Sequence, residues 1–453
     1  MDAQAKGPVV VVDAGYLFWK SGTIPEADQA QRALKASLQA EAYALLGLDG
    51  FTPGAGDLAL GVETFTRVTG PLNVLAGNLR CGETTWPGGR VVERGGQRVG
   101  ILGVVGEGEA PGDAAGGCVV SDPVAAAKAA AVSLGDVDLL IALHTGGASL
   151  SAKLAEAVPG LDFVLDGKVG ASFPEPRPLA GGQVFELGAG GQGKKLGVLS
   201  LELVEGATAW DGAVATGELE RRITLAKKRV AEAEAALAGA ADEASKARLS
   251  QRLVTLQRQV TELESQLAAL APTTPGPVNR FSVELVELSA KVPDHPPTQA
   301  LVTATLAQIN GVAAQPSATQ APSRAFAGSE TCRACHPAAF TQWSSTPHAR
   351  AYASLEAAQR ANDRDCYACH VTGAFHPEGP QAPEGLSPAL RDVGCESCHG
   401  PGLSHSGAPA AHPMRPAVAP EVCLSCHDGD RDGGRFDADV YRPKVLHGVG
   451  AGG

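Results

Sequence analysis

Eight of the ten cysteines fall into four Cys-x-x-Cys-His units. This spacing suits covalent haem c attachment, because two thiols bond to the vinyl groups of one haem and the next residue supplies an imidazole to its iron. Cys-x-x-Cys pairs also build structural zinc sites, but zinc does not require a histidine after every second cysteine. The sequence therefore predicts four haem c groups. The predicted thioether residues are Cys332, Cys335, Cys366, Cys369, Cys395, Cys398, Cys423 and Cys426, and the predicted proximal ligands are His336, His370, His399 and His427.

Further histidines surround these motifs. Those that follow the first motif are His348, His376, His405, His412 and His447. A second imidazole completes six-coordinate haem iron, so we expect most of them to be distal ligands, with a surface histidine as the alternative for any one of them. If every iron has two histidines, the module can only relay electrons. If one iron is open, a small oxidant could bind there.

The segment that carries the motifs, residues 328–453, has few apolar side chains and many Gly, Pro, Ser and Ala residues. We expect short helices and long loops in which the porphyrins complete the core, by analogy with folding that is coupled to metal binding. An Ala-, Pro-, Ser- and Gln-rich tract at 313–327 reads as a semi-extended linker before this module.

The phrases GSETCRACHPAAFTQWSSTPHARA, CYACHVTG, VGCESCHGPGLSH, CLSCH and YRPKVLH resemble the tetrahaem cytochromes c that accept electrons from hydroxylamine oxidoreductase. The resemblance covers nearly all of residues 328–447. It implies that His348, His405 and His447 are distal ligands. Members of that family can leave one haem five-coordinate, so His376 or His412 fills the fourth site, or neither does.

Before the linker, the pattern of apolar residues changes twice. Short apolar runs alternate with helical stretches over residues 1–216, which indicates an α/β domain. Apolar residues then recur at alternating spacings of four and three over 217–271, with polar residues and Gly239 in the middle, which favours an antiparallel helical hairpin over one long rod. Residues 272–312 read as a strand and a helix that return to the first domain.

The first domain contains the phrases VVVVDAGYLF, ALLGLDGFTPGAGDLALG, LNVLAGN, LLIALHTGG and AVPGLDFVLDGKV, in this order. In these phrases it resembles the calcineurin-like metallophosphoesterases of the 5'-nucleotidase and UDP-sugar hydrolase kind. Active members hold two metal ions, but most ligand positions differ here: Gly15-Tyr16, residues 54–57 and residues 167–170 replace the family's ligand motifs. Only His144 stands at a matching ligand position. The resemblance therefore implies a phosphoesterase fold that has lost its chemistry.

The whole is thus expected to be multidomain: an α/β metallophosphoesterase-like sandwich, a helical hairpin (coiled coil) and a mainly α, loop-rich tetrahaem cytochrome c module. The net charge of -12 carries no basic block, which argues against nucleic acid as a partner. No apolar run reaches the roughly 18 residues of a membrane span. Cys81 and Cys118 could form a disulfide or remain two thiols.

These features predict a multihaem cytochrome that carries electrons in an extracytoplasmic respiratory chain. The expected partners are redox proteins, either other cytochromes or a quinol-linked donor, and the hairpin could pair copies of the chain. The alternatives are a nitrite- or hydroxylamine-type reductase at an open haem and a residual phosphohydrolase. Haem c is attached outside the cytoplasm, so we expect the protein to lie in the periplasm or at the extracellular face. Because the sequence shows no export signal, we also expect the natural protein to start further upstream.

Overall fold

The computed structural model describes residues 7–20, 22–109, 117–168, 172–191, 193–239, 243–269, 277–289, 291–313, 324–415, 418–429 and 435–447. Its contacts divide the chain into two compact units. Unit 1 contains residues 1–25 and 39–294, and unit 2 contains residues 26–38 and 295–453. Helix α1 (Glu26–Leu46) is one continuous helix whose first part belongs to unit 2 and whose last part belongs to unit 1.

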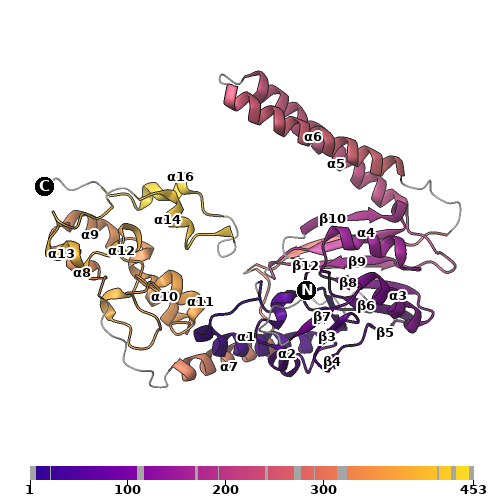
Figure 1. The fold of residues 1–453 in the computed structure, drawn as a ribbon, viewed down its shortest axis with the longest axis horizontal. Helices are drawn as coiled ribbons and strands as arrows, with labels where there is room; N and C mark the ends of the chain where they lie inside the picture. Colours follow the sequence, from indigo (N-terminus) through magenta and orange to yellow (C-terminus); the bar gives the residue numbers. More distant parts are fainter. Residues whose placement is uncertain are drawn as a thin grey trace. The chain divides into compact units, whose positions relative to one another are not determined.

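A six-stranded sheet forms the centre of unit 1 (Figure 1). Its strand order is β10-β11-β9-β8-β6-β5, with parallel pairing from β6 through β8 and β9 to β11 and antiparallel pairing at both edges. The strands are β5 (Gly89–Arg94), β6 (Gln97–Val104), β8 (Leu139–His144), β9 (Phe163–Asp166), β10 (Ser172–Leu179) and β11 (Val184–Ala189). Strand β8, Leu-Leu-Ile-Ala-Leu-His, is buried along its whole length, as expected for a parallel strand covered on both faces.

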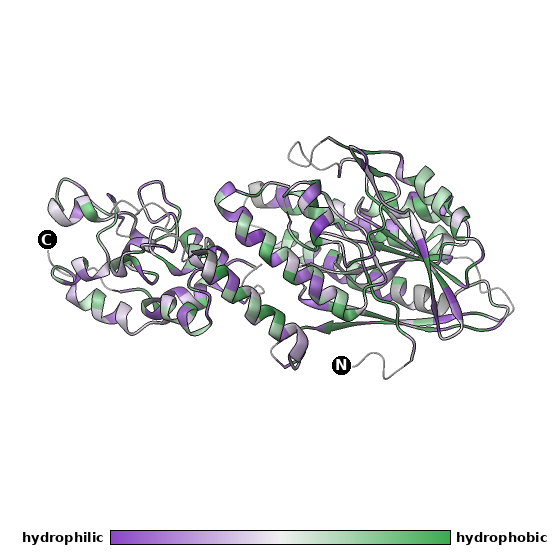
Figure 2. Ribbon diagram, turned by 90° about the horizontal axis from the view of Figure 1, so that it is seen from below, coloured by the Kyte–Doolittle hydropathy of each residue, from purple (hydrophilic) through white to green (hydrophobic). Residues whose placement is uncertain are grey.

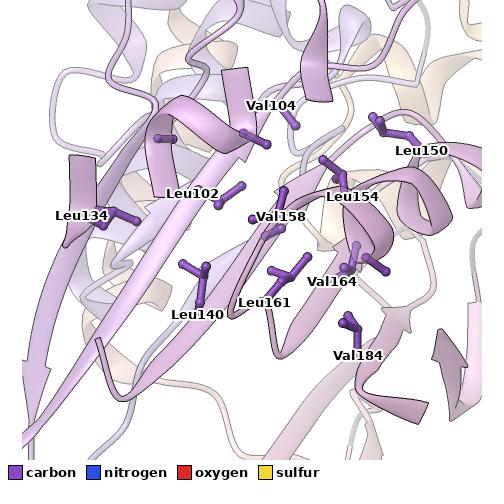
Figure 3. Close-up of a cluster of buried hydrophobic side chains, with 14 residues drawn as sticks. Leu102, Val104, Leu134, Leu140, Leu150, Leu154, Val158, Leu161, Val164 and Val184 are labelled. Carbon is purple, nitrogen blue, oxygen red and sulfur yellow. The ribbon is translucent and has the colours of Figure 1, made fainter. Parts of the chain in front are cut away.

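Alternate side chains of β8 enter two different cores. Leu140 and Ala142 pack with residues of α3 (Pro123–Leu134) and α4 (Ala148–Ala157), as Figure 3 shows for the labelled leucines and valines. Ile141 and Leu143 pack on the opposite face with Trp210 and Phe281. In Figure 2 the strands inside unit 1 are coloured largely as hydrophobic. The expected α/β architecture is therefore present, with helices on one face of the sheet.

Smaller sheets complete unit 1. Strands β12 (Lys195–Glu202) and β13 (Arg280–Glu287) pair antiparallel, and their apolar residues join the second core. Strands β1 (Val12–Asp13) and β2 (Gly50–Phe51) pair in parallel. Strand β3 (Leu79–Cys81) lies between β4 (Thr84–Thr85) and β7 (Cys118–Val120). A disulfide joins Cys81 to Cys118, which lie directly opposite each other in the β3–β7 register, so one of the two expected alternatives is present.

The predicted hairpin consists of α5 (Gly212–Ala238) and α6 (Glu243–Ala269), which lie side by side (Figure 1). The seam between them contains Leu219, Ile223, Ala226 and Leu263, all buried. Lys227 pairs with Glu264 across the seam at 2.7 Å. On each helix the residues that face the other helix recur every three to four positions, as the heptad spacing predicted.

Unit 2 is built from short helices and loops apart from the first part of α1 and α7 (Pro296–Ala313). Its small core contains Phe326, Tyr352, Tyr367, Val371 and Leu390. The remaining helices are α8 (Ser329–Arg333), α9 (Pro337–Ser344), α10 (Ala351–Ala357), α11 (Arg364–His370), α12 (Cys395–His399), α13 (Leu403–Gly407), α14 (Pro420–Leu424) and α16 (Ala438–Tyr441). The loop-rich, mainly helical module is thus as expected.

The grouping by contacts differs from the expected domain boundaries in two places. Residues 26–38 were expected in the first domain and group with unit 2. Helix α7 was expected to return to the first domain, as β13 does, and it also groups with unit 2. Most of the expected linker, residues 314–323, lies outside the described residues. Among the described residues no helix is long and apolar enough to cross a membrane.

Candidate haem sites

Each Cys-x-x-Cys-His motif lies on or beside a single helical turn. In the first motif the backbone N–H of His336 donates to the carbonyl of Cys332 at 2.9 Å, and in the fourth His427 donates to Cys423 at the same distance. Residues three and four positions apart lie on one face of a helix, so both thiols and the imidazole of each motif project to the same side. This is the arrangement that thioether attachment and axial ligation of one haem require.

The structure brings three of the four motif histidines to face a second histidine. The ring centres are 6.5 Å apart for His336 and His405, 6.1 Å for His348 and His427, and 5.6 Å for His399 and His447. Two imidazoles on opposite sides of one metal ion place their ring centres roughly 6 Å apart, given a metal–nitrogen bond of about 2.0 Å. The residues present therefore fit a haem iron between each pair.

Hydrogen bonds hold several of these rings by their Nδ1 atoms. His399 donates from Nδ1 to the carbonyl of Arg415 at 2.7 Å, His405 to the carbonyl of His412 at 2.9 Å, and His370 to the carbonyl of Ala351 at 2.7 Å. Such a bond fixes the tautomer and leaves Nε2 as the metal-facing nitrogen. The geometry at these three histidines is that of axial ligands with outer supports.

His370 differs from the other motif histidines, because no described histidine faces its ring. His376 lies edge-on to Phe326, with centres 5.2 Å apart, and its Nδ1 accepts from the backbone N–H of Glu378. His412 contributes its backbone carbonyl to His405. Within the described residues neither His376 nor His412 is paired with a motif histidine, so their roles as distal ligands stay a prediction.

The motif cysteines are close to one another in space. The Cys332 and Cys395 thiols share a hydrogen bond, which is the main reason why the pKa of Cys395 falls to about 6 and that of Cys332 is raised. Burial raises the pKa of Cys398 to about 11, with smaller contributions from Cys423 and the other neighbouring thiols. The first, third and fourth motifs therefore form one cluster. Burial, and then the nearby His427, lower the pKa of His348.

Glu396 is a supporting residue that the sequence analysis missed. It lies between the two cysteines of the third motif and is only 3% exposed. Its carboxylate accepts from the backbone N–H groups of Ala327 at 2.9 Å, Gly328 at 2.8 Å and Gly402 at 2.7 Å. A buried carboxylate needs such donors. The sequence showed a glutamate inside the third motif, but a charged residue at such a position is usually expected to be exposed.

In unit 1 the position expected for a metal ligand has a different use. The Nδ1 atom of His144 accepts from the backbone N–H of Gly146 at 3.0 Å, so Nε2 carries the proton and donates to Ser151 at 2.8 Å. Ser151 in turn donates to Glu186 at 2.5 Å. Both imidazole nitrogens of His144 are therefore engaged within the protein. Burial lowers the pKa of His144 to about 4, opposed by the charge of Asp166.

The other replaced positions of the expected phosphoesterase site form internal contacts as well. The Tyr16 hydroxyl donates to Glu109, which Lys168 also approaches at 3.3 Å. Asp57 accepts from the backbone N–H groups of Tyr16, Phe18 and Gly54, each at 2.8 Å. Residues 169 and 170 lie outside the described residues. In the part of the chain that the structure describes, no group of three or more His, Cys, Asp and Glu residues is arranged to hold a metal ion.

Comparison with known proteins follows the same division of the chain. Residues 331–400 match the family model described as cytochrome c554 and c-prime. Over these residues the C-terminal module is similar to cytochrome c554. The curated cytochrome c-554 of Nitrosomonas europaea is 41% identical over 97 residues, which are 18% of this chain and 41% of that protein. The match thus spans less than half of the relative. The expected resemblance of the C-terminal module to this cytochrome family is confirmed.

Solved structures similar to the chain include two from Thermus thermophilus. The sulfate thiohydrolase SoxB in complex with glycerol has a TM-score of 0.43 and 15% identity, over 73% of this chain and 50% of that chain. A 5'-nucleotidase precursor has a TM-score of 0.43 and 17% identity, over 69% of this chain and 52% of that chain. Both likenesses have low identity and low TM-scores, so they say nothing about the activity of unit 1.

Proposed function

We propose that this protein is an extracytoplasmic multihaem c-type cytochrome that carries electrons through four covalently bound haems. The observation that supports this most is the facing of His336 with His405, His427 with His348 and His399 with His447 at ring distances that suit one iron each. When bound, haem c supplies the interchange of ferric and ferrous iron at each site. The chain's own residues hold the sites close together, since thiols of the first, third and fourth motifs contact or influence one another.

The protein groups determine what each site can do. Paired imidazoles occupy both axial positions and exclude small ligands, and they favour low potentials relative to Met/His ligation. Carbonyl oxygens at Nδ1 of His399 and His405 raise the basicity of these ligands. None of the three histidine pairs leaves an axial position at which a substrate could bind, so a relay between redox partner proteins is the function that these sites support.

Attachment outside the cytoplasm supports a periplasmic location or one on the extracellular face. The Cys81–Cys118 disulfide is consistent with such an oxidising compartment. The partners we propose are other cytochromes or a quinol-linked donor, with pairing of two copies through α5 and α6 as a further possibility for assembly. Unit 1 acts as a non-catalytic part, because His144 is engaged by Gly146 and Ser151.

A second candidate function rests on His370. Among the described residues no histidine faces its ring, which supports an open position at the second haem. An open iron could bind nitrite, hydroxylamine or a similar small molecule and reduce it. This would make the protein a reductase with three relay haems and one reactive haem.

Optical and electron paramagnetic resonance spectra of the full chain, with iron and haem counted per chain, test both functions. Four low-spin irons would support the relay. Three low-spin irons and one high-spin iron that changes on addition of nitrite or hydroxylamine would support the reductase. Fewer than four haems per chain would overturn the proposed cofactor content.

A further inference from the structure

The helix that carries the second motif, α11, has an unusual set of neighbours. Its Tyr367 is fully buried in the core of unit 2 and donates to the carbonyl of Ala382 at 2.8 Å. Its first turn is capped by Asp363, whose carboxylate accepts from the backbone N–H of Asp365 at 3.1 Å. Asp363 is only 1% exposed, so this carboxylate needs cationic or N–H partners.

The partner of Asp363 comes from the opposite end of the chain. Lys35 of α1 forms an ion pair with Asp363 and a second one with Asp365 at 2.7 Å. Arg360 adds a local contact to Asp363 at 3.1 Å. Exposed ion pairs contribute little to stability, but a pair whose carboxylate is buried leaves an uncompensated charge when its partner is removed. Lys35 therefore matters more than an ordinary surface lysine.

The rest of the first half of α1 contacts the same segment. The side-chain amide of Gln31, only 7% exposed, donates to the carbonyl of Asn362 at 2.7 Å and accepts from the backbone N–H of Arg364 at 3.1 Å. Arg32 pairs with Asp365, and Asp28 pairs with Arg364. These contacts follow one face of α1, because the residues are spaced three or four apart.

Helix α7 provides independent support to the loop before α11. Asn310 donates to the carbonyl of Gln359 at 3.3 Å and accepts from the amide of Asn362 at 3.1 Å. Gln359 has a φ of 57°, a left-handed conformation that is unfavourable for a side chain of this kind and persists only when neighbours hold it. Two helices from outside the motif region thus converge on residues 359–365.

The structure assigns Lys35 as a positioning residue for the second haem, acting through Asp363 on the helix that carries Cys366, Cys369 and His370. The assignment rests on the proposed attachment of haem at this motif. From outside α11 the His370 Nδ1 atom contacts the carbonyl of Ala351 at 2.7 Å and, more weakly, the Ser354 hydroxyl at 3.4 Å. The direction of α11 therefore decides where its imidazole lies. Helix α1 then helps to position the second haem, a role that the spacing of the motifs does not predict.

The test compares three full-chain variants by spectropotentiometric titration with haem counted per chain. Lys35→Gln removes the cation, Lys35→Arg keeps it, and Lys128→Gln removes an exposed lysine of α3 as the matched control. Loss of a positive charge beside the site favours the oxidised iron, which carries one more positive charge than the reduced iron. We expect one of four midpoint potentials to become more negative in Lys35→Gln and to be unchanged in Lys35→Arg and in Lys128→Gln.

A second pair of variants identifies the haem that responds. In a chain that also carries Cys366→Ser and Cys369→Ser, the second haem is removed, and Lys35→Gln should then shift none of the three remaining potentials. A shift that persists there, or an unshifted Lys35→Gln protein, would refute the positioning role. A wild-type chain with fewer than four haems would instead contradict the proposed function. Failure of the proposed function and failure of the positioning role therefore give different results.

A second experiment, which leaves every side chain of α1, α7 and α11 unchanged, covers the case in which Lys35→Gln does not fold. A protease site placed between Ala313 and Arg324 would cut the chain without changing α1, α7 or α11. We expect the two fragments to co-elute in gel filtration at moderate salt and to separate at high salt, as ion pairs are screened. Fragments that separate at moderate salt would overturn the proposal.

Discussion

His405 donates from Nδ1 to the backbone carbonyl oxygen of His412 at 2.9 Å, and its ring lies 6.5 Å from that of His336, inclined by 18°. From the sequence, His405 was expected as a distal ligand and His412 only as one alternative for the fourth site, and the structure gives the two residues different parts in one site. His405 presents its imidazole toward the motif histidine, whereas His412 supplies a main-chain acceptor that orients it.

This difference gives a prediction with a built-in control. His405→Ala should convert the low-spin first haem to a high-spin one, because His336 would then be its only imidazole ligand. His412→Ala keeps its carbonyl and should remain low-spin at that haem. Electron paramagnetic resonance of both variants decides the matter, and a new high-spin signal in His412→Ala would instead make this residue a ligand.

Acid should destabilise unit 1 through His144. Burial lowers the pKa of His144 to about 4, so between pH 6.5 and 4 the unfolded chain binds a proton there that the folded chain does not. Stability is fully present above pH 6.5 and is lost as the pH falls through this window, by roughly 3 kcal/mol at 1.36 kcal/mol per pH unit. Urea unfolding of wild type and His144→Gln at pH 7 and pH 4.5 measures this.

The comparison between the two proteins isolates the histidine. Asp57, whose pKa burial raises to about 7, titrates over an overlapping range with the opposite sign but is present in both. Wild type should therefore lose stability relative to His144→Gln on acidification. Parallel losses in the two proteins would show that His144 does not control the acid response.

The disulfide between β3 and β7 should stabilise unit 1 mainly by restricting the unfolded chain. Its cysteines are 37 positions apart, for which loop closure gives about 3 to 4 kcal/mol. We expect Cys81→Ala with Cys118→Ala to lower the free energy of unfolding by that amount. Denaturation under oxidising and reducing conditions provides the check, since only the wild type should respond to reductant.

Glu396 should be a stability determinant of unit 2. Glu396→Gln removes the charge and turns one accepting oxygen into a donor that faces a backbone N–H, which costs roughly 2 to 3 kcal/mol for a charge-assisted hydrogen bond. Thermal unfolding followed by the haem Soret band should shift downward. Glu330→Gln is the matched control, as Glu330 is exposed and forms an ion pair with Arg333 at 3.5 Å. Equal effects of the two changes would contradict the assignment.

Patterns within short stretches of sequence correctly predicted the elements that form from neighbouring residues. The apolar run of β8, the heptad spacing of Leu219, Ile223 and Leu263, and the Cys-x-x-Cys-His turns each have a period that the chain itself displays. The histidine pairs were predicted only in part, because their choice of partner depends on how loops return across the module. The resemblance supplied His348, His405 and His447, and the structure adds which motif histidine each one faces.

The contacts of α1 lay beyond this kind of prediction. The helical period over 26–46 is visible in the sequence, but nothing near Lys35 shows that its ion-pair partner is Asp363. Opposite charges are common on exposed helices and pair with many candidates. The same limit applies to α7, whose sequence indicates a helix but not the unit with which it groups.

The division of α1 between two compact units has a consequence for biosynthesis. Residues 26–38 leave the ribosome before most of unit 1, residues 39–294, while the segment they contact, 359–365, is made near the end of the chain. The second motif therefore reaches its full support only when the two ends of the polypeptide meet, a slow step because contacts so distant along the chain form late. Machinery that attached haem to Cys366 and Cys369, as proposed, would therefore meet either an α11 that still lacks α1 or a nearly complete protein, depending on when it acts.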